Sequence, residues 1–366
     1  MFSRRAMIRS TAALGVSVLL PSFGRAATSA AAAGFHYPDE AAPHARTFMQ
    51  WPVNTEVHTD AVFLETLQTT IATIANTISE FEPVVMLMSK EQEALARKAL
   101  GAKVEIWDIP TDDLWARDSG PSFVVDGKGG LAMTQFNFNG WGNKQVHDND
   151  GKIAARVAER LGLQIFDAGL VGEAGGVESD GAGMLLAHES SWVNTNRNNG
   201  DRADIERRLF ETMGATSIIW APGVKDADIT DYHIDALARF VKPGLVVVQL
   251  PDEIDDQDPW SVSAFETYTA IENRRSLKGV NMQLAILPEP LNPRVKTDDF
   301  VASYVNYYVC NGAVIGAEFG DEAADAEAKQ ILKELYPNRE IVMLNIDPVG
   351  EVGGGIHCAT HEQPKV

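Results

Sequence analysis

The sequence predicts an α/β fold assembled from five repeated strand–helix–strand units, and two observations support this. Short apolar runs alternate with amphipathic stretches of helical length, and no low-complexity linker divides residues 38–366. The alternation recurs about every 50 to 65 residues, a period typical of a propeller or array rather than of one open sheet. We therefore expect a five-bladed, pseudo-symmetric α/β propeller. An ordinary α/β sheet is the alternative.

The first unit begins with an apolar strand at 47–51, followed by a helix. Apolar residues recur along this helix at spacings of three and four, which gives one buried face; they are Leu64, Leu67, Ile71, Ile74 and Ile78. Further apolar runs at 84–88 and 104–107 predict strands. Between them, Ser89 and Gln92 have the spacing of a capping box, which predicts the start of a second helix.

The other four units repeat the order of strand, helix and strand. Each helix is recognised by its length and periodicity, and each strand by a short apolar run. The second unit has strands at 133–138 and 163–166 around a helix near 151–161; the third has 184–187 and 217–220 around 201–213; the fourth has 245–250 and 281–287 around 261–274; the fifth has 304–309, 313–316 and 341–344, with a helix near 322–335.

The first 30 residues have the composition of an export signal. Arg4 and Arg5 lie in a basic opening segment, an apolar stretch runs from Thr11 to Leu20, and small residues follow up to Ala30. Paired arginines in this arrangement indicate the twin-arginine route. We expect a signal peptide over 1–30, a single catalytic domain over 31–366 and a periplasmic location. A signal retained as a membrane anchor is the alternative, although the apolar stretch is short for a membrane span.

The charge balance limits the partners. The chain has 31 basic and 51 acidic residues, and without the four arginines of the first 30 residues the remainder carries −24. Such a charge argues against nucleic acid or an anionic membrane surface as a partner, and it suits a small cationic substrate. No later stretch is long and apolar enough to predict an integral membrane segment in the mature chain. The sequence leaves the oligomeric state open, with a homo-oligomer as one option.

Polar residues follow the closing strands of the units in register. Asp118, Glu173, His233, Asp235 and Cys358 all lie in such segments. If the units surround an axis, these segments meet at one pocket. The corresponding segment of the fourth unit, 288–300, has no such motif, and we expect it to shape the entrance. Each residue also has an ordinary structural interpretation, such as a surface ion pair for Asp118 or a hydrogen-bonded structural role for His233.

Cys358 is the candidate nucleophile, because it follows a run of three glycines. A glycine run leaves the backbone open, so a substrate atom can approach the sulfur closely. A nearby histidine supports the reactive thiolate, and His233 is the best partner. In an extended segment His233 and Asp235 would face the same way, and Glu173 could orient the imidazole. A small buried residue near a tight turn is the structural alternative for Cys358.

Two carboxylates beside the thiol favour a particular substrate class. Asp118 and Asp235 would repel the oxyanion of a peptide carbonyl, but they suit a guanidinium, which carboxylates bind in bidentate fashion. Trp115 adds an aromatic face for the cation or its alkyl tail, or else belongs to the core. The thiolate would attack the guanidinium carbon, His233 would protonate the departing ammonia, and water would hydrolyse the covalent intermediate.

At these residues the chain resembles the agmatine deiminase family, which shares its domain with bacterial-type peptidylarginine deiminase. The matching stretches run in order through nearly the whole mature chain; they are PHARTFMQWP at 43–52, DLWARDSGPSFVV at 113–125, FNGWGNK at 138–144, EAGGVESDGAGMLL at 173–186, NRN at 196–198, TDYHIDALARFVKPG at 230–244, SYVNYYVCNGAVI at 303–315, FGD at 319–321 and GGGIHC at 353–358. WARD, HID and GGGIHC are the most specific.

The resemblance implies a five-bladed α/β propeller and hydrolytic deimination without a metal or organic cofactor. It implies Cys358 as nucleophile, His233 as general acid and base, Glu173 as the carboxylate beside that histidine, and Asp118 and Asp235 as guanidinium clamps. Agmatine is the first choice of substrate, which would give N-carbamoylputrescine and ammonia. Arginine in a peptide or another guanidine is the second.

Several positions depart from the family pattern. The family commonly has glycine where Ala174 and Tyr232 stand and asparagine where Ala236 stands, and its usual ending reads like CITQQQP rather than CATHEQP. None of these changes removes a reacting group. They affect the fit of the substrate tail.

Three other interpretations remain open from the sequence. His357, Cys358 and His361 form a compact cluster of the kind that can bind zinc, although three neighbours on one short segment rarely reach the required geometry. A non-catalytic periplasmic protein could use the acidic pocket to bind cationic amines. Finally, Cys310 lies in an apolar run and is expected to be a core thiol, with a disulfide to Cys358 as the alternative.

Overall fold

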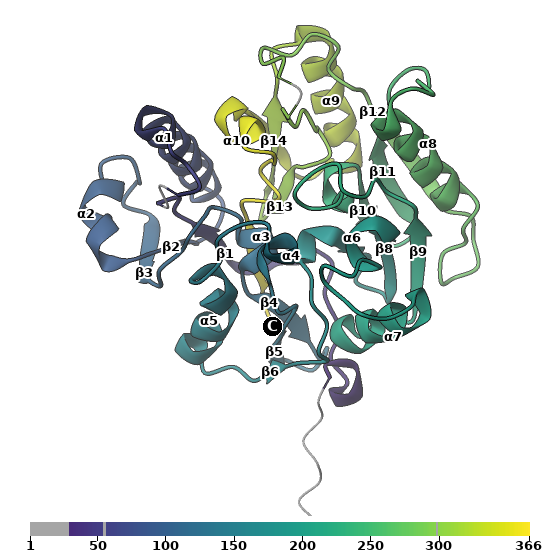
Figure 1. Cartoon of the computed structure of the whole chain (residues 1–366), viewed down its shortest axis with the longest axis horizontal. Helices are drawn as coiled ribbons and strands as arrows, with labels where there is room; N and C mark the ends of the chain where they lie inside the picture. The colour runs from purple at the N-terminus through teal and green to yellow at the C-terminus, as the bar shows by residue number, and fades with distance from the viewer. Residues whose placement is uncertain (1–28, 54–55, 298) are drawn as a thin grey trace, which may run out of the picture.

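A computed structural model describes residues 29–53, 56–297 and 299–366 of the chain. Its strands form five separate small sheets within these residues. Figure 1 shows the sheets following one another around the molecule in chain order, with the longer helices toward the outside. The fold is therefore of the mixed α/β class, as the sequence predicts.

The first sheet joins the two ends of the described chain. Its strand order is β16-β1-β2-β3, in which β1, β2 and β3 are parallel and β16 is antiparallel to β1. Helix α1 connects β1 to β2, and two short helices connect β2 to β3. The bounds are β1 His44–Gln50, α1 Ala61–Ile78, β2 Val84–Met88, the 3-10 helix η2 Lys90–Gln92, α2 Glu93–Ala96, β3 Val104–Asp108 and β16 His361–Pro364.

The other four sheets share one topology. An antiparallel pair of strands is followed by a helix that crosses over to a third strand, which lies parallel to the second. The four sets are β4 Ser122–Val125, β5 Leu131–Thr134, α5 Ile153–Leu161 and β6 Ile165–Phe166; β7 Val177–Ser179, β8 Met184–His188, α7 Arg202–Met213 and β9 Ser217–Ala221; β10 Ala238–Lys242, β11 Leu245–Gln249, α8 Pro259–Glu272 and β12 Gln283–Leu287; and β13 Tyr308–Cys310, β14 Ala313–Glu318, α9 Glu322–Leu335 and β15 Glu340–Asn345.

Short helices occupy the remaining connecting segments, and several carry the candidate site residues. They are the α-helices α3 Ala116–Ser119, α4 Gly140–Asn143, α6 Glu189–Trp192 and α10 Asp347–Glu351, and the 3-10 helices η1 Ala31–Ala33, η3 Asp150–Lys152, η4 Ala174–Gly176 and η5 Ile234–Ala236.

Four of the long helices begin at an aspartate whose side chain caps backbone N–H groups of the first turn. These N-caps are Asp60 for α1, Asp201 for α7, Asp258 for α8 and Asp321 for α9. Such a cap satisfies donors that have no partner inside the helix. The predicted capping box is wrong, because Ser89 makes no side-chain cap and leads only into short helical turns.

The structure differs from the predicted strands in two respects. The strand expected at 304–309 begins only at Tyr308, and the strand expected at 133–138 is β5, which ends at Thr134. In addition, the sequence prediction omitted the antiparallel partner strand in four of the five sheets, β4, β7, β10 and β16. The repeated unit thus contains one strand more than the strand–helix–strand pattern.

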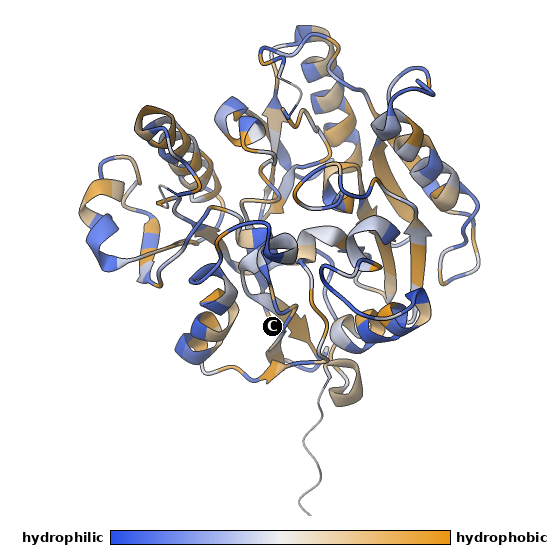
Figure 2. Cartoon of the chain, viewed as in Figure 1, coloured by the Kyte–Doolittle hydropathy of each residue, from blue (hydrophilic) through white to orange (hydrophobic). Residues whose placement is uncertain are grey.

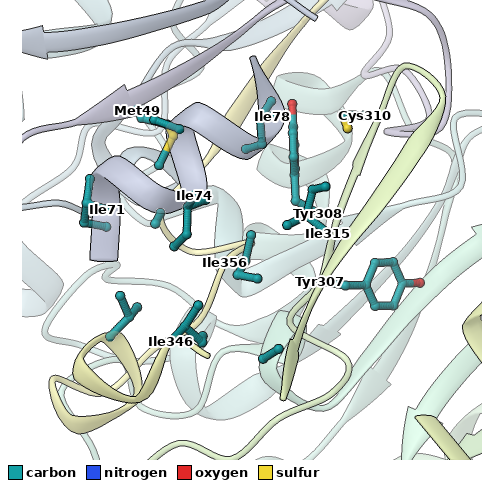
Figure 3. Close-up of a cluster of buried hydrophobic side chains, with 14 of the residues drawn as sticks. Met49, Ile71, Ile74, Ile78, Tyr307, Tyr308, Cys310, Ile315, Ile346 and Ile356 are labelled. Carbon is teal, nitrogen blue, oxygen red and sulfur yellow. The ribbon is translucent and has the colours of Figure 1, made fainter. Parts of the chain in front are cut away.

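The largest core cluster connects α1 with the strands and the C-terminal segment. Figure 3 shows Ile71, Ile74 and Ile78 of α1 in the same cluster as Met49 and Ile356, and all five side chains are fully buried. Figure 2 shows apolar residues concentrated in the strands and along one side of helices such as α9, whose other side is hydrophilic. The core therefore fixes the segment that leads directly to Cys358.

The predicted export signal lies almost entirely outside the described residues. Ser29 and Ala30, its last two residues, are buried, and Ala30 packs in a core cluster with Tyr37. Across the ranges that the structure describes, the helices are too short or too polar to cross a membrane.

We predict that Ile74→Ala lowers the free energy of unfolding by about 2–5 kcal/mol, because it removes buried apolar atoms and leaves a cavity. Urea denaturation measures this change. Thr73→Ala, at an exposed position of the same helix, should change it by less than about 0.5 kcal/mol. Equal losses for the two variants would contradict the assignment of the buried face.

Candidate active site

Cys358 lies in a loop held from both sides by buried residues. Ile356, two positions earlier, is fully buried in the main core cluster, and β16 begins three residues later. Asn306 contacts the cysteine twice: its amide Nδ2 donates to Sγ at 3.1 Å, and its Oδ1 accepts from the Cys358 backbone N–H at 3.2 Å. The thiol therefore has a fixed position and a polar hydrogen-bond donor.

A close approach between Gly355 and Asn306 explains one glycine of the preceding run. A Cβ at Gly355 would lie 2.4 Å from Oδ1 of Asn306, which is far inside contact distance. A side chain at this position would push the asparagine away from the thiol. The run therefore serves the packing around Cys358 as well as the openness expected from the sequence.

His233 and Glu173 form a buried pair, as the sequence suggests. Nε2 of the imidazole donates to Oε2 of Glu173 at 3.1 Å, and both side chains are at least 96% buried. Arg197 holds the carboxylate from its other side, since Nε lies 2.9 Å from both oxygens of Glu173. The same guanidinium donates to Oδ2 of Asp231 at 2.6 Å and to the carbonyl of Thr230 at 3.0 Å. One arginine thus connects Glu173 to the segment that carries His233.

The segment before His233 makes an unusual turn. Asp231 and Tyr232 have φ of 59° and 68°, in the left-handed region that favours glycine. This explains the common glycine of the family at position 232. Here the Tyr232 ring packs against Trp260 and His188, and the His188 ring donates to the Tyr232 carbonyl at 2.9 Å. These contacts hold a conformation that would otherwise be strained.

Asp118 lies on α3 and has a donor for each carboxylate oxygen. Nε1 of Trp141 donates to Oδ2 at 2.8 Å, and the Gly175 backbone N–H donates to Oδ1 at 3.3 Å. Nδ1 of His233 is 3.6 Å from the same Oδ1. Trp141 has φ of 55° inside the FNGWGNK stretch, so that stretch bends the chain to aim the indole at Asp118.

Asp118, His233 and Asp235 converge at Gly175. A Cβ placed on that glycine would lie 2.7 Å from Oδ1 of Asp118 and 2.9 Å from Nδ1 of His233. It would also lie 3.1 Å from Oδ2 of Asp235. The absence of a side chain at position 175 is therefore what lets the three groups share one space.

The expected geometry of the His233 segment is partly wrong. His233 is extended, but residues 234–236 form the 3-10 helix η5, so alternation along an extended chain does not bring Asp235 into the site. Instead the turn of η5 does so. Sγ of Cys358 lies 3.5 Å from Oδ2 of Asp235.

The charges of the site affect one another. Burial works to lower the pKa of His233, but Asp118 and Glu173 outweigh it and raise that pKa to about 9. Burial raises the pKa of Asp118 to about 6. Burial, then Asp235 and Asp118, raise the pKa of the Cys358 thiol well above its ordinary value. In the absence of substrate the thiol therefore keeps its proton.

The thiol and the imidazole are not a hydrogen-bonded pair, contrary to the direct partnership suggested by the sequence. Sγ contacts Asn306 and Asp235, while His233 contacts Glu173. Trp115 is buried in the main core cluster, and its ring covers Gly354, where a Cβ would lie 2.4 Å from Cζ3. It packs against the cysteine loop.

The H-C-x-x-H cluster does not have the geometry of a zinc site. His357 directs its nitrogens to Asp235 and Glu40, whereas His361 directs its nitrogens to the Tyr37 hydroxyl and the Ala116 carbonyl. The two imidazoles therefore serve separate hydrogen-bond networks. Cys310 is a free, buried thiol in β13, and burial raises its pKa beyond the ordinary range.

Sequence reasoning missed four residues that position the site. They are Trp141, Arg197, Asn306 and His357. All four lie within stretches that carry the family resemblance, but none of them has a residue type that by itself indicates its partner.

Comparison with known proteins identifies the family. The model of the Porphyromonas-type peptidyl-arginine deiminase family matches residues 36–364. The chain belongs to this family. An agmatine deiminase of Stutzerimonas stutzeri is 33% identical, with 90% of this chain and 96% of that protein covered. A Streptomyces coelicolor protein provisionally given the same name is 34% identical, with 90% and 99% covered.

Solved structures show the same fold. The agmatine deiminase of Enterococcus faecalis has a TM-score of 0.85 at 25% identity, with 93% of this chain and 99% of that chain covered. A C. jejuni agmatine deiminase has a TM-score of 0.78 at 23% identity, with 90% and 96% covered. The similarity therefore extends over nearly the whole described chain.

We predict that Arg197→Lys lowers the free energy of unfolding by about 1–3 kcal/mol, because a single ammonium cannot bridge two buried carboxylates. Guanidinium chloride unfolding measures this loss. Arg207→Lys is the matched control, since Arg207 also bridges two acids but is 57% exposed. That variant should change stability by less than about 1 kcal/mol. A tolerated Arg197→Lys would show that the bridge is dispensable.

Proposed function

We propose that this protein is a hydrolytic deiminase of a guanidino substrate, with agmatine as the first choice and peptidylarginine or another guanidine as the second. The observation that carries the proposal is the convergence of Asp118, His233 and Asp235 at Gly175, with the Cys358 thiol beside Asp235. Two carboxylates in one buried space suit a planar cation with several N–H donors. The names of the relatives favour agmatine.

Binding of the cation would itself activate the thiol. Burial and the negative charges of Asp235 and Asp118 raise the pKa of Cys358, and a guanidinium between these carboxylates would compensate those charges. The thiolate then forms as the substrate enters and the thiol proton passes to solvent water, without a hydrogen bond from His233 to the sulfur. Nδ2 of Asn306 donates to Sγ and would stabilise the thiolate further.

The reaction then proceeds through a covalent intermediate. The Cys358 thiolate forms a bond to the guanidinium carbon, and protonated His233 gives its proton to one nitrogen, which leaves as ammonia when its C–N bond breaks. Neutral His233 takes a proton from water, whose oxygen attacks the same carbon. The C–S bond then breaks, the sulfur leaves as thiolate and takes up the hydroxyl proton of the adduct, and a urea forms, which from agmatine is N-carbamoylputrescine. Glu173 keeps the imidazole oriented throughout.

The surroundings of the pocket support two further assignments. Trp115 lies over Gly354 of the cysteine loop, a position from which its ring could face the substrate's alkyl tail. The five sheets, with their shared topology and their order around the molecule, support a five-bladed propeller whose connecting segments meet at the site.

We also propose that the protein is exported. The paired Arg4 and Arg5, the apolar stretch and the small residues that follow support a twin-arginine signal over the first 30 residues, with one catalytic domain after it. The enzyme would then meet its substrate in the periplasm. Fractionation of cells that make the full chain, with and without Arg4→Lys and Arg5→Lys, tests the location.

We predict that the purified protein releases ammonia from agmatine, and that Cys358→Ala abolishes the release. Arginine, an arginyl peptide and methylated guanidines, assayed in parallel, identify the preferred tail. Circular dichroism of Cys358→Ala controls for folding. If the reduced, folded protein releases no ammonia from any guanidine, the hydrolase assignment fails, and a protein that only binds amines becomes the better explanation.

We predict a bell-shaped dependence of kcat/KM on pH. Below about pH 6 the Asp118 clamp becomes neutral, and above about pH 9 His233 loses the proton that ammonia needs. Because kcat/KM reports the free enzyme, these limits are expected for the coupled groups of the empty site. Trp141→Phe removes a hydrogen bond that lowers the Asp118 pKa, so it should move the acid limb to higher pH. An acid limb that stays in place would exclude Asp118 as its origin.

A further inference from the structure

His357 links the site to a second buried charge network. Its Nδ1 lies 2.7 Å from Oδ2 of Asp235, and its Nε2 lies 2.8 Å from Oε2 of Glu40. The three residues are far apart in sequence, and their side chains are 2%, 1% and 12% exposed for His357, Asp235 and Glu40. The imidazole therefore lies between two buried carboxylates.

Glu40 is itself held in place by three other groups. Its Oε2 accepts from Arg239 at 2.7 Å and from Arg117 at 3.1 Å, and its Oε1 accepts from the Val309 backbone N–H at 2.9 Å. Burial would raise the pKa of Glu40, but Arg239, His357 and Arg117 lower it well below its ordinary value. Glu40 is therefore a fixed anion behind His357.

The two oxygens of Asp235 have different surroundings. Oδ2 is bound by His357 and lies 3.5 Å from the Cys358 thiol. Oδ1 is buried and has no hydrogen-bond partner within the described residues. A buried carboxylate oxygen without a donor is costly unless a ligand supplies one. The bond to His357 fixes the plane of the carboxylate and with it the direction in which Oδ1 accepts.

We propose that His357 is a positioning residue that orients the Asp235 carboxylate for the guanidinium, and that Glu40 holds the imidazole in the orientation this requires. The inference rests on the proposed function, because it assigns the free acceptor capacity of Asp235 to the cation. We call the pair the Glu40–His357 relay.

The geometry explains why a histidine suits this position. A bidentate grip on a guanidinium needs a carboxylate whose plane is set in advance. The rigid imidazole reaches two carboxylates with opposite ring nitrogens, and without it Glu40 and Asp235 would lack the donor that lies between them. A role that is only structural would depend on the volume of the side chain. It would not depend on whether an N–H group is retained at the position of Nδ1 or at that of Nε2.

Two substitutions separate these roles. His357→Asn places an amide N–H near the position of Nδ1, so it keeps a donor for Asp235 and loses the contact with Glu40. His357→Gln places the amide near the position of Nε2, so it keeps the contact with Glu40 and leaves Asp235 without its donor. Gln is closer to histidine in volume, so the two interpretations predict opposite orders of activity.

The experiment measures KM and kcat for the preferred guanidine with the full chain and both variants. We expect His357→Gln to raise KM by about 10- to 100-fold, the range for one lost hydrogen bond to a charged group. The increase in KM for His357→Asn should be smaller by a factor of at least about five. The inhibition constant of the urea product, which carries no guanidinium charge, should change by less than about threefold in either variant.

His58→Asn is the matched control. His58 donates from Nε2 to the buried Asp113 at 2.9 Å, and this bond lies outside the proposed relay and makes no contact with Cys358. The control should lose stability in urea without altering KM. Glu40→Gln tests the relay from its other end and should raise KM by about 3- to 10-fold. This variant still tests the proposal if the His357 variants do not fold.

The outcomes are distinct. If the parent protein is active and the KM of His357→Gln is equal to or lower than that of His357→Asn, the relay is overturned. An unchanged KM in Glu40→Gln overturns it as well. A parent protein that turns over no guanidine overturns the proposed function and the relay with it. A lower KM for His357→Asn than for His357→Gln supports the orienting role of Nδ1.

Discussion

Three buried carboxylates surround His233 and repel one another, and two of them also raise the pKa of the Cys358 thiol, so each needs its own partner in the protein. Glu173 has Arg197, whose Nε lies 2.9 Å from both of its oxygens. Asp235 has His357 at 2.7 Å. Asp118 accepts one indole N–H and one backbone N–H, and the His233 imidazole lies 3.6 Å from Oδ1, yet burial still raises its pKa to about 6. The less a partner compensates the negative charge of a carboxylate, the more strongly that carboxylate attracts a cation.

The topology is what brings these partners together. Pairing of β16 with β1 places the cysteine loop beside the segment before β1, where Glu40 lies. Trp141 and Arg197 come instead from the connections between the second and third strands of their sheets, β5 to β6 and β8 to β9. The glycines contribute where two groups need the same space, as Gly175 does for the clamp residues. The core, through Ile356, holds the Cys358 loop in place beside this arrangement.

The candidate reacting groups could be selected from the sequence, because their residue types indicate their chemistry. A cysteine after glycines, a histidine near aspartates and paired carboxylates each indicate a role. Their partners could not be predicted in this way: Asn306 looks like a strand-edge polar residue, and Glu40 lies in an acidic, unremarkable segment. The fold shows the same division. Helix α9 was predicted with its observed bounds, 322–335, because its apolar face is periodic. Strand β16, with the sequence HEQP, has no apolar run and is defined only by its partner β1.

The resting state of the site also explains how a deimination cycle could reset itself. The empty pocket combines a protonated thiol, a histidine whose pKa is raised to about 9 and carboxylates held for a cation. A guanidinium matches this arrangement, whereas the urea formed from it carries no charge there. Loss of that charge removes the ion pairs with Asp118 and Asp235 and restores the repulsion that raises the pKa of Cys358. Product release and reprotonation of the thiol would then follow from one electrostatic change.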